Sequence, residues 1–331
     1  MNILYTLNDA YVPHLAASVC SLAENNRDAD EITFYIASMG IREENKKAIS
    51  SLCERYSRKV EIIEIGDIRQ MLPEGVDTKG FHISVLARLF LAKYLPATCD
   101  RIIYLDCDTI IIDSILPFWK VEMGTNILAG VPEPVITKTR KPLLNMPEEA
   151  DYYNAGVFLF DLKRWRAEKC DETVIRYFCD RFLELVANDQ DAINACLCGR
   201  IQTVPPKYNY ASYNIYYNYK LLKKLAGKAP YVSREVWEDS RKHPAIIHYL
   251  GEERPWRKGN THPYAKEYIK YLSKTDWKEN PPEEGWKFYF FCFRIFNFVT
   301  KPFPALRYRI IDSLIPAFMR HRAKQNKKKE K

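Results

Sequence analysis

The first half of the chain alternates between short apolar runs and amphipathic segments. The apolar runs are rich in Ile, Val, Tyr and Phe and predict strands, whereas the segments between them have apolar residues at helical spacing. The predicted strands are "NILYTL", "EITFYIAS", "KVEIIEIG" and "RIIYLD", and the predicted helices are "VPHLAASVCSLAENN", "REENKKAISSLCERY" and "SVLARLFLAKYL". This alternation predicts an α/β fold with a mostly parallel sheet and helices on both of its faces.

The second half of the chain is less regular. It contains further apolar runs at "NILAGV", "AGVFLFDL" and "PAIIHYLG", and a short helix opens at "NDQDAINACLC", where Asn188 or Asp189 can cap the first turn. The segment "NYASYNIYYNY" has no clear period, and from Trp286 onward the composition is aromatic and basic. We therefore expect a main domain over 1–260, a connector over 261–285 and a C-terminal tail over 286–331.

The positive charge of the chain is concentrated in this tail. The 331 residues include 50 Lys and Arg and 42 Asp and Glu, for a net charge of +8. The tail holds 12 of the basic residues and two of the acidic ones, so the rest of the chain has 38 basic and 40 acidic residues. A nucleic-acid groove in the main domain is therefore disfavoured.

The cysteines and the N-terminus indicate a protein of a reducing cytosol. The nine cysteines are odd in number and contain no Cys-x-x-Cys pair, which disfavours a zinc ribbon or a disulfide framework. Most lie among apolar residues, as buried free thiols do. The chain opens on an apolar strand and has no run of ~20 apolar residues, so we expect neither a signal peptide nor a membrane-spanning helix.

Two carboxylates, Asp106 and Asp108, interrupt the apolar stretch "RIIYLDCDTIII". They follow a predicted strand, and open α/β sheets bind ligands at the carboxyl ends of their strands. Two close carboxylates repel each other and are costly to desolvate, so a partner should offset their charge. Mg²⁺ or Mn²⁺ would do so, and a turn stabilised by the aspartates is the alternative. Apolar residues on both sides favour the fixed geometry of a metal site.

Two further candidates lie in apolar surroundings. His248 ends "PAIIH" and is either a core histidine or a third metal ligand, since imidazole suits Mn²⁺ better than Mg²⁺ or Ca²⁺. Arg88 has apolar neighbours at helical spacing in "SVLARLFLAKYL". Either its stem covers the surface with its head in water, or its guanidinium clamps a phosphate or a catalytic carboxylate.

The tail combines an apolar stripe with basic residues. Leu306, Ile310 and Leu314 are spaced by four residues, arginines flank them, and "KKKEK" ends the chain. This pattern predicts a helix that lies on an anionic membrane surface. A helix docked on the main domain, or a nucleic-acid-binding tail, are the alternatives.

Six motifs, in this order, resemble glycosyltransferase family 8, which includes bacterial lipopolysaccharide galactosyl- and glucosyltransferases and glycogenin. The motifs are "NILYTLNDAYVPHLAASVCSL", "SVLARLFLAKYLP", "RIIYLDCDTIII", "YYNAGVFLFDLKRW", "NDQDAIN" and "IIHYLGEERPW". The resemblance covers roughly residues 1–260. It implies a GT-A fold, a UDP-sugar donor, Mn²⁺ (or Mg²⁺) as cofactor and retention of anomeric configuration.

The resemblance also implies roles for individual residues. The metal ligands would be Asp106, Asp108 and His248, and the catalytic residues would be Arg88, Asp189 and Gln190, the last two beside the anomeric carbon. The implied donor-binding residues, which would contact uracil, ribose, diphosphate or sugar, are Thr6, Asn8, Asp9, Arg88, Asp106, Cys107, Glu133, Asn154, Ala155, Gly251 and Arg254.

Two positions depart from the family pattern. Arg254 stands where the family usually has Lys before Pro-Trp, and because it keeps the charge, diphosphate binding should survive. Glu133 stands near the position where galactosyl members tend to have Asp. The extra methylene changes the reach of the carboxylate, so galactose and glucose both stay open as the donor sugar.

The hypothesis from the sequence is a retaining hexosyltransferase that moves galactose or glucose from a UDP-sugar to a glycan or glycolipid acceptor, such as lipopolysaccharide or another cell-surface polysaccharide. We expect it in the cytoplasm, on the inner face of the cell membrane, with no nucleic-acid partner. For retention, same-face attack is favoured over a protein nucleophile. The alternatives are a metal-dependent nucleotidyltransferase and a non-enzymatic membrane-surface binding protein.

Overall fold

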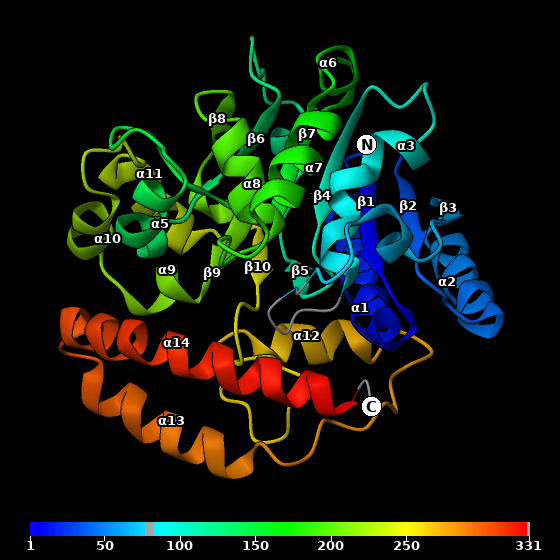
Figure 1. Ribbon diagram of the computed structural model, residues 1–331. Helices are drawn as coiled ribbons and strands as arrows, with labels where there is room; N and C mark the ends of the chain where they lie inside the picture. The colour runs from blue at the N-terminus through cyan, green and yellow to red at the C-terminus, as the bar shows by residue number, and fades with distance from the viewer. Residues whose placement is uncertain (77, 79–82, 330–331) are drawn as a thin grey trace.

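The computed structural model describes residues 1–76, 78 and 83–329, and a seven-stranded sheet forms its centre (Figure 1). The order of the strands is β3-β2-β1-β4-β7-β6-β8. Their bounds are β1 Asn2–Leu7, β2 Thr33–Ser38, β3 Lys59–Glu64, β4 Arg101–Leu105, β6 Leu128–Pro132, β7 Tyr153–Asp161 and β8 Ile201–Thr203. All neighbours pair in parallel except β7, which is antiparallel to both β4 and β6. The predicted mostly parallel α/β sheet is confirmed.

Each face of this sheet is covered by its own hydrophobic core. Helices α1 (Val12–Asn25), α2 (Glu43–Arg55) and α12 (Ala265–Leu272) contribute to the core on one face. The other core includes residues of α3 (Leu91–Tyr94), α6 (Leu162–Ala167), α7 (Cys170–Arg181) and α8 (Asp189–Cys196). The inner strands β1, β2, β4, β6 and β7 are buried on both faces, which explains their nearly continuous apolar sequences, whereas the edge strand β3 has no buried residue.

A second, three-stranded sheet brings distant parts of the chain together. Its order is β5-β10-β9, with bounds Thr109–Ile111, Ile246–His248 and Tyr210–Ala211. Strand β10 is antiparallel to β5, and its last residue His248 lies opposite Thr109. This register places His248 beside Asp108, the residue that precedes β5.

The segment "SVLARLFLAKYL" is mostly a 3₁₀ helix, η3 (Ile83–Phe90), followed by one turn of α3. We predicted a single regular helix here. In a 3₁₀ helix, residues three apart stack on one face. Val85 and Arg88 therefore lie one above the other, and the Arg88 Nε donates to the Val85 carbonyl at 3.1 Å.

The remaining helices lie at both ends of the sheet. Helix α4 (Leu116–Trp119) is at the amino end of β4, away from the candidate site, where the Arg101 guanidinium donates to the Trp119 carbonyl at 2.9 Å. Helix α5 (Thr137–Leu143) follows β6. The irregular tyrosine-rich segment becomes β9, α9 (Ser212–Tyr216) and the start of α10 (Tyr219–Ala226), which pack with α11 (Arg234–Lys242) in a third cluster.

The tail forms two helices, α13 (Lys287–Thr300) and α14 (Pro304–Lys329), which run side by side along one side of the main domain (Figure 1). Within the described part of the chain, neither these nor any other helix has the length and apolar character needed to cross a membrane.

Candidate active site

A cavity of about 750 Å³ opens at one edge of the large sheet. Strands β1, β4 and β6 point their carboxyl ends toward it, and the antiparallel β7 begins there. Residues from all four positions line the cavity, including Thr6, Asp106, Glu133 and Asn154. This is the edge at which open α/β sheets bind ligands.

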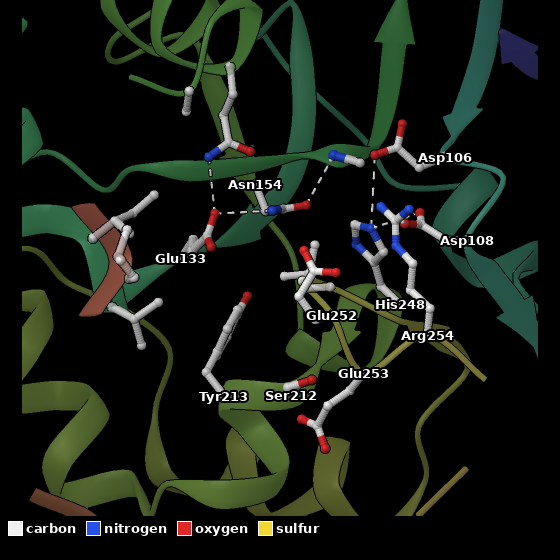
Figure 2. A pocket seen from close by; sticks show the side chains of 18 of the residues that line it. Asp106, Asp108, Glu133, Asn154, Ser212, Tyr213, His248, Glu252, Glu253 and Arg254 are labelled. Carbon is white, nitrogen blue, oxygen red and sulfur yellow. Dashed lines mark hydrogen bonds and ion pairs between the residues drawn. The ribbon is translucent and has the colours of Figure 1, made fainter. Parts of the chain in front are cut away.

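Three residues that can hold a divalent cation meet at this edge. Asp106, Asp108 and His248 each offer one ligand atom, and these atoms lie within 4.8 Å of one another. The Nε2 of His248 is 3.3 Å from Asp108 Oδ1 and 3.8 Å from Asp106 Oδ2 (Figure 2). The predicted metal ligands are thus brought together from β4, β5 and β10.

The hydrogen bonds behind His248 define its free nitrogen. The Gly156 N–H donates to Asn154 Oδ1 at 3.0 Å, and that oxygen also accepts from the Asn209 amide nitrogen at 2.9 Å. The Asn209 oxygen therefore faces His248 Nδ1, at 2.8 Å, and must accept a proton from it. Consequently Nε2 is the ring nitrogen that faces the two aspartates and is left to bind a metal ion. Two carboxylates and an imidazole fit Mn²⁺ or Mg²⁺.

Charges around Asp108 keep this carboxylate ionised. Burial alone would raise its pKa, but the hydrogen bond and charge of His248 and the charge of Arg254 lower the pKa to about 2. For His248, burial lowers the pKa, and the hydrogen bond and charge of Asp108 outweigh this and raise it. Each of these two groups therefore shifts the pKa of the other toward its charged form.

Gly156 in β7 leaves the space that the metal ligands occupy. A Cβ at this position would lie 2.2 Å from His248 Cε1 and 2.8 Å from Asp106 Oδ2. The Gly156 carbonyl also accepts from the Asp106 N–H at 2.8 Å. No signal in the sequence indicated a role for this residue, although it completes the N-A-G motif of Asn154 and Ala155.

Arg88 connects the metal ligands to the predicted catalytic pair. It is buried, with Nη2 3.1 Å from Asp106 Oδ1 and Nε 2.7 Å from Asp189 Oδ2. Of the two interpretations of Arg88, the clamp on a carboxylate is therefore correct. Burial raises the pKa of Asp189 to about 6, although the Arg88 charge opposes the shift.

Gln190 belongs to a hydrogen-bond network that includes Glu133. Its Oε1 accepts from the Ala155 N–H at 2.9 Å, and its Nε2 donates to Glu133 Oε2 at 3.1 Å. The same carboxylate oxygen accepts from Asn154 Nδ2 at 3.0 Å (Figure 2). Burial raises the pKa of Glu133. These groups form a polar pocket suited to sugar hydroxyls.

The other predicted donor-binding residues divide into two groups. Thr6, Cys107, Gly251 and Arg254 line the cavity. The Arg254 Nη2 is 3.4 Å from Asp108 Oδ2, and its Nη1 donates to the Tyr11 hydroxyl at 2.7 Å.

Asn8 and Asp9 directly follow β1 but are not among the described residues that line the cavity. The Asp9 carboxylate instead accepts from the Arg42 backbone and from Asn45, at 2.9 and 2.7 Å, and pairs with the Arg42 side chain at 2.7 Å. The structure thus places Asp9 at the start of α2, away from the metal ligands.

Sequence analysis also missed residues contributed by α9 and by the tail. Tyr213 is buried, its hydroxyl has no hydrogen-bond partner among the described residues, and its ring points from α9 toward Glu133 (Figure 2). No periodic signal in the tyrosine-rich segment indicated this position. The tail residues that line the cavity are Tyr289, Phe293, Phe296, Arg307, Tyr308, Ile310, Ile311, Asp312, Leu314 and Ile315.

Comparison with known proteins identifies the family. The family model described as glycosyl transferase family 8 matches residues 2–259. The chain belongs to glycosyl transferase family 8. General stress protein A of Bacillus subtilis is 28% identical, over 84% of this chain and 94% of that protein. Lipopolysaccharide 1,2-glucosyltransferase of Escherichia coli K12 is 26% identical, over 86% of this chain and 81% of the relative.

A solved structure shows the same GT-A fold. The galactosyltransferase LgtC, in complex with donor and acceptor sugar analogs, superimposes with a TM-score of 0.71 and 23% identity, over 87% of this chain and 99% of that chain. Membership of family 8 and the similarity to the curated relatives make the protein a glycosyltransferase, with a nucleotide-sugar donor and a glycan acceptor. The prediction of a glycosyltransferase, rather than a nucleotidyltransferase or a non-enzymatic binding protein, is confirmed. The tail lies beyond the residues that the family model matches.

Proposed function

We propose that this glycosyltransferase is a retaining hexosyltransferase that moves galactose or glucose from a UDP-sugar to a glycan acceptor, and that Mn²⁺ (or Mg²⁺) is required. The observation that carries the proposal is the meeting of Asp106, Asp108 and His248 at the carboxyl edge of the sheet, beside the buried Arg88–Asp189 pair. A relative from Escherichia coli is a lipopolysaccharide 1,2-glucosyltransferase, and one from Salmonella typhimurium is a lipopolysaccharide 1,3-galactosyltransferase. We therefore propose lipopolysaccharide or another cell-surface polysaccharide as the acceptor.

Several groups around the cavity can place positive charge near the diphosphate of the donor. Asp106, Asp108 and His248 would hold a divalent cation, which would supply positive charge to the leaving diphosphate. Arg254 and Arg88 add their own charges on either side of the ligands, at 3.4 Å from Asp108 and 3.1 Å from Asp106. Because both guanidinium groups are already held by carboxylates or hydroxyls, they need little reorganisation as charge develops.

Retention follows most simply from attack on the face that the diphosphate leaves. Gln190 is a poor nucleophile, and its amide is held by Ala155 and Glu133. The Asp189 carboxylate is held by Arg88. These restraints favour a role for both residues in positioning the sugar and stabilising its developing positive charge, while the leaving phosphate takes the proton of the acceptor hydroxyl.

The tail supports a location at the membrane surface. Of the twelve large hydrophobic residues that are exposed in the described part of the chain, nine lie between Phe288 and Ile315. The same tail has the excess of Lys and Arg. We propose that it attaches the enzyme to the anionic inner face of the cell membrane, where an acceptor under construction is found.

A panel of UDP-sugars incubated with Mn²⁺ tests the proposal through the release of UDP. We expect release with UDP-galactose or UDP-glucose and its loss in EDTA. Asp108→Asn should lower the rate at least ~100-fold, because it removes a charged ligand from the site where the leaving group develops charge. Asp113→Asn is the matched control, since Asp113 is exposed and not among the cavity-lining residues. Near-normal turnover of the Asp108 variant would contradict the metal role.

A further inference from the structure

The cavity has two chemically different sides. Charged and hydrogen-bonding groups surround the metal ligands at the sheet edge, whereas helices α13 and α14 supply mostly aromatic and aliphatic side chains, together with Arg307 and Asp312. Those of α14 include Ile310, Ile311, Leu314 and Ile315. The tail is therefore a wall of the same cavity that holds the candidate catalytic groups, besides being a surface element.

Two adjacent residues attach α14 to the rest of the protein. Arg307 is 3% exposed, and its guanidinium carbon lies 4.1 Å from the centre of the Tyr216 ring in α9 and 4.9 Å from that of Phe296 in α13. The Tyr308 hydroxyl donates to the Val135 carbonyl at 3.1 Å, in the turn that follows Glu133. These contacts reach both helix α9 and the turn that follows Glu133, so the wall has a defined position.

The apolar wall continues to the outside of the molecule. Leu314 lines the cavity and is nevertheless 58% exposed, which places it at the mouth. Helix α13 has its cavity residues at positions 289, 293 and 296 and exposed apolar residues at positions 288, 291, 295 and 298. One helix thus has a face toward the cavity and an apolar face toward the exterior.

We propose that α14 forms the acceptor side of the active site, and that its residues Ile311, Leu314 and Ile315 bind the apolar part of an amphiphilic acceptor. The inference rests on the proposed function. A nucleotide-sugar is charged and polar, and matches the metal side of the cavity rather than this wall. Covering exposed apolar side chains with an apolar group contributes about 25 cal/mol for each Å² of apolar surface buried, and a purely hydrophilic glycan supplies no such group.

The orientation of such an acceptor follows from the two sides. Its apolar chain lies against α14, at the end of the cavity that is continuous with the exposed apolar residues of the tail. Its sugar extends from there toward Tyr213 and Glu133, whose hydroxyl and carboxylate face the interior. In this arrangement the tail selects the acceptor directly, in addition to holding the enzyme at a surface.

Binding of octyl glucoside and of methyl glucoside to the full chain, with Mn²⁺ and UDP present, tests the inference by calorimetry. Burial of about two methylene groups would make octyl glucoside bind about tenfold tighter. Leu314→Gln should remove most of this difference. Leu306→Gln is the matched control, because Leu306 is in the same helix and 50% exposed but does not line the cavity.

Equal affinities of the two glucosides, or equal losses in both leucine variants, would overturn the inference, because the octyl chain would then not be bound in the cavity. Release of UDP from UDP-sugars by the same wild-type sample is measured separately. If no UDP-sugar is turned over but Leu314 governs octyl glucoside binding, the proposed function fails and the apolar subsite stands. If UDP is released and Leu314→Gln does not change octyl glucoside binding, the proposed function stands and the apolar subsite fails.

Discussion

One buried arginine links two carboxylates with different roles. Arg88 contacts Asp106, a predicted metal ligand, and Asp189, a predicted catalytic residue, through different guanidinium nitrogens. Arg88 and Asp189 are buried, and the lower local dielectric strengthens the interaction between them. A change of charge at Asp189 is therefore felt at the metal ligands through Arg88.

The raised pKa of Asp189 predicts a pH dependence. With Mn²⁺ at saturation, kcat/KM should fall as the pH decreases through about 6, because protonation of Asp189 releases Arg88. Stability should change in the opposite direction. The folded pKa lies above the ordinary 3.8, so the folded protein holds this proton more tightly and loses stability as the pH rises from about 4 to about 6.

Rate profiles and thermal melting of the wild type and Asp189→Asn check both signs. The Asn variant should lack the inflection near pH 6 in both measurements. A wild-type rate that is flat between about pH 5 and 8 would show that the charge of Asp189 is not needed.

Several site residues could be predicted from the sequence alone, and the reasons are local. Asp106 and Asp108 were identified because apolar residues surround two adjacent charges. Arg88 and His248 stayed ambiguous, because a buried polar residue is defined by its partner and both have partners that are distant in the sequence. Gly156 could not be predicted, because its role is to leave space for the His248 ring, and that ring comes from a distant part of the sequence.

At the level of the elements, the direction of β7 determines what faces the cavity. Asp106 follows the end of β4, whereas Asn154 and Gly156 stand near the start of β7. Only the antiparallel pairing of these two strands places both at the same edge. The apolar run predicted the strand, but apolar residues alone do not show whether a strand pairs in parallel or antiparallel with its neighbours. Likewise β5, β9 and β10 have two or three residues each, too few for a periodicity.

The close passage of β7 behind the metal ligands predicts the effect of Gly156→Ala. The added Cβ would collide with the His248 ring, so the ring must shift. We expect Mn²⁺ affinity, measured by calorimetry, to fall at least ~10-fold, as it does when the orientation of a ligand is disturbed.

Gly130→Ala in the neighbouring strand β6 is the control. A Cβ there would lie 2.4 Å from Phe158 Cε1, in the core and away from the ligands. This variant should melt at a lower temperature yet bind Mn²⁺ normally while folded. Equal Mn²⁺ affinity in both variants would show that Gly156 has no specific role at the metal site.

In the whole molecule, the tail has one face that contacts the main domain and another that is exposed. Arg307 and Tyr308 fasten it to the main domain, and its exposed apolar residues face outward. The sequence suggested a membrane helix and a docked helix as alternatives, because an amphipathic stripe does not reveal what covers it. The docked arrangement is present, and it leaves a second apolar surface for the proposed membrane contact.

Deletion of residues 286–331 should move the protein from the membrane fraction to the soluble fraction. Co-sedimentation with vesicles that contain anionic lipid measures this change. Replacing Lys327, Lys328 and Lys329 by Gln leaves the docked part intact and should weaken binding in low salt, because each lysine contributes about 1 kcal/mol near an anionic surface. Vesicle binding unaltered by either change would refute the membrane role.

The antiparallel strand also affects how the protein is made. Strand β4 leaves the ribosome long before β7, its partner on one side, so the nascent chain carries a half-built sheet with an open inner edge. Such an edge can pair with a neighbouring chain. Synthesis through Asp161 closes the gap, and His248 comes later still. We therefore expect the nascent polypeptide to be prone to aggregation until the three predicted metal ligands can meet.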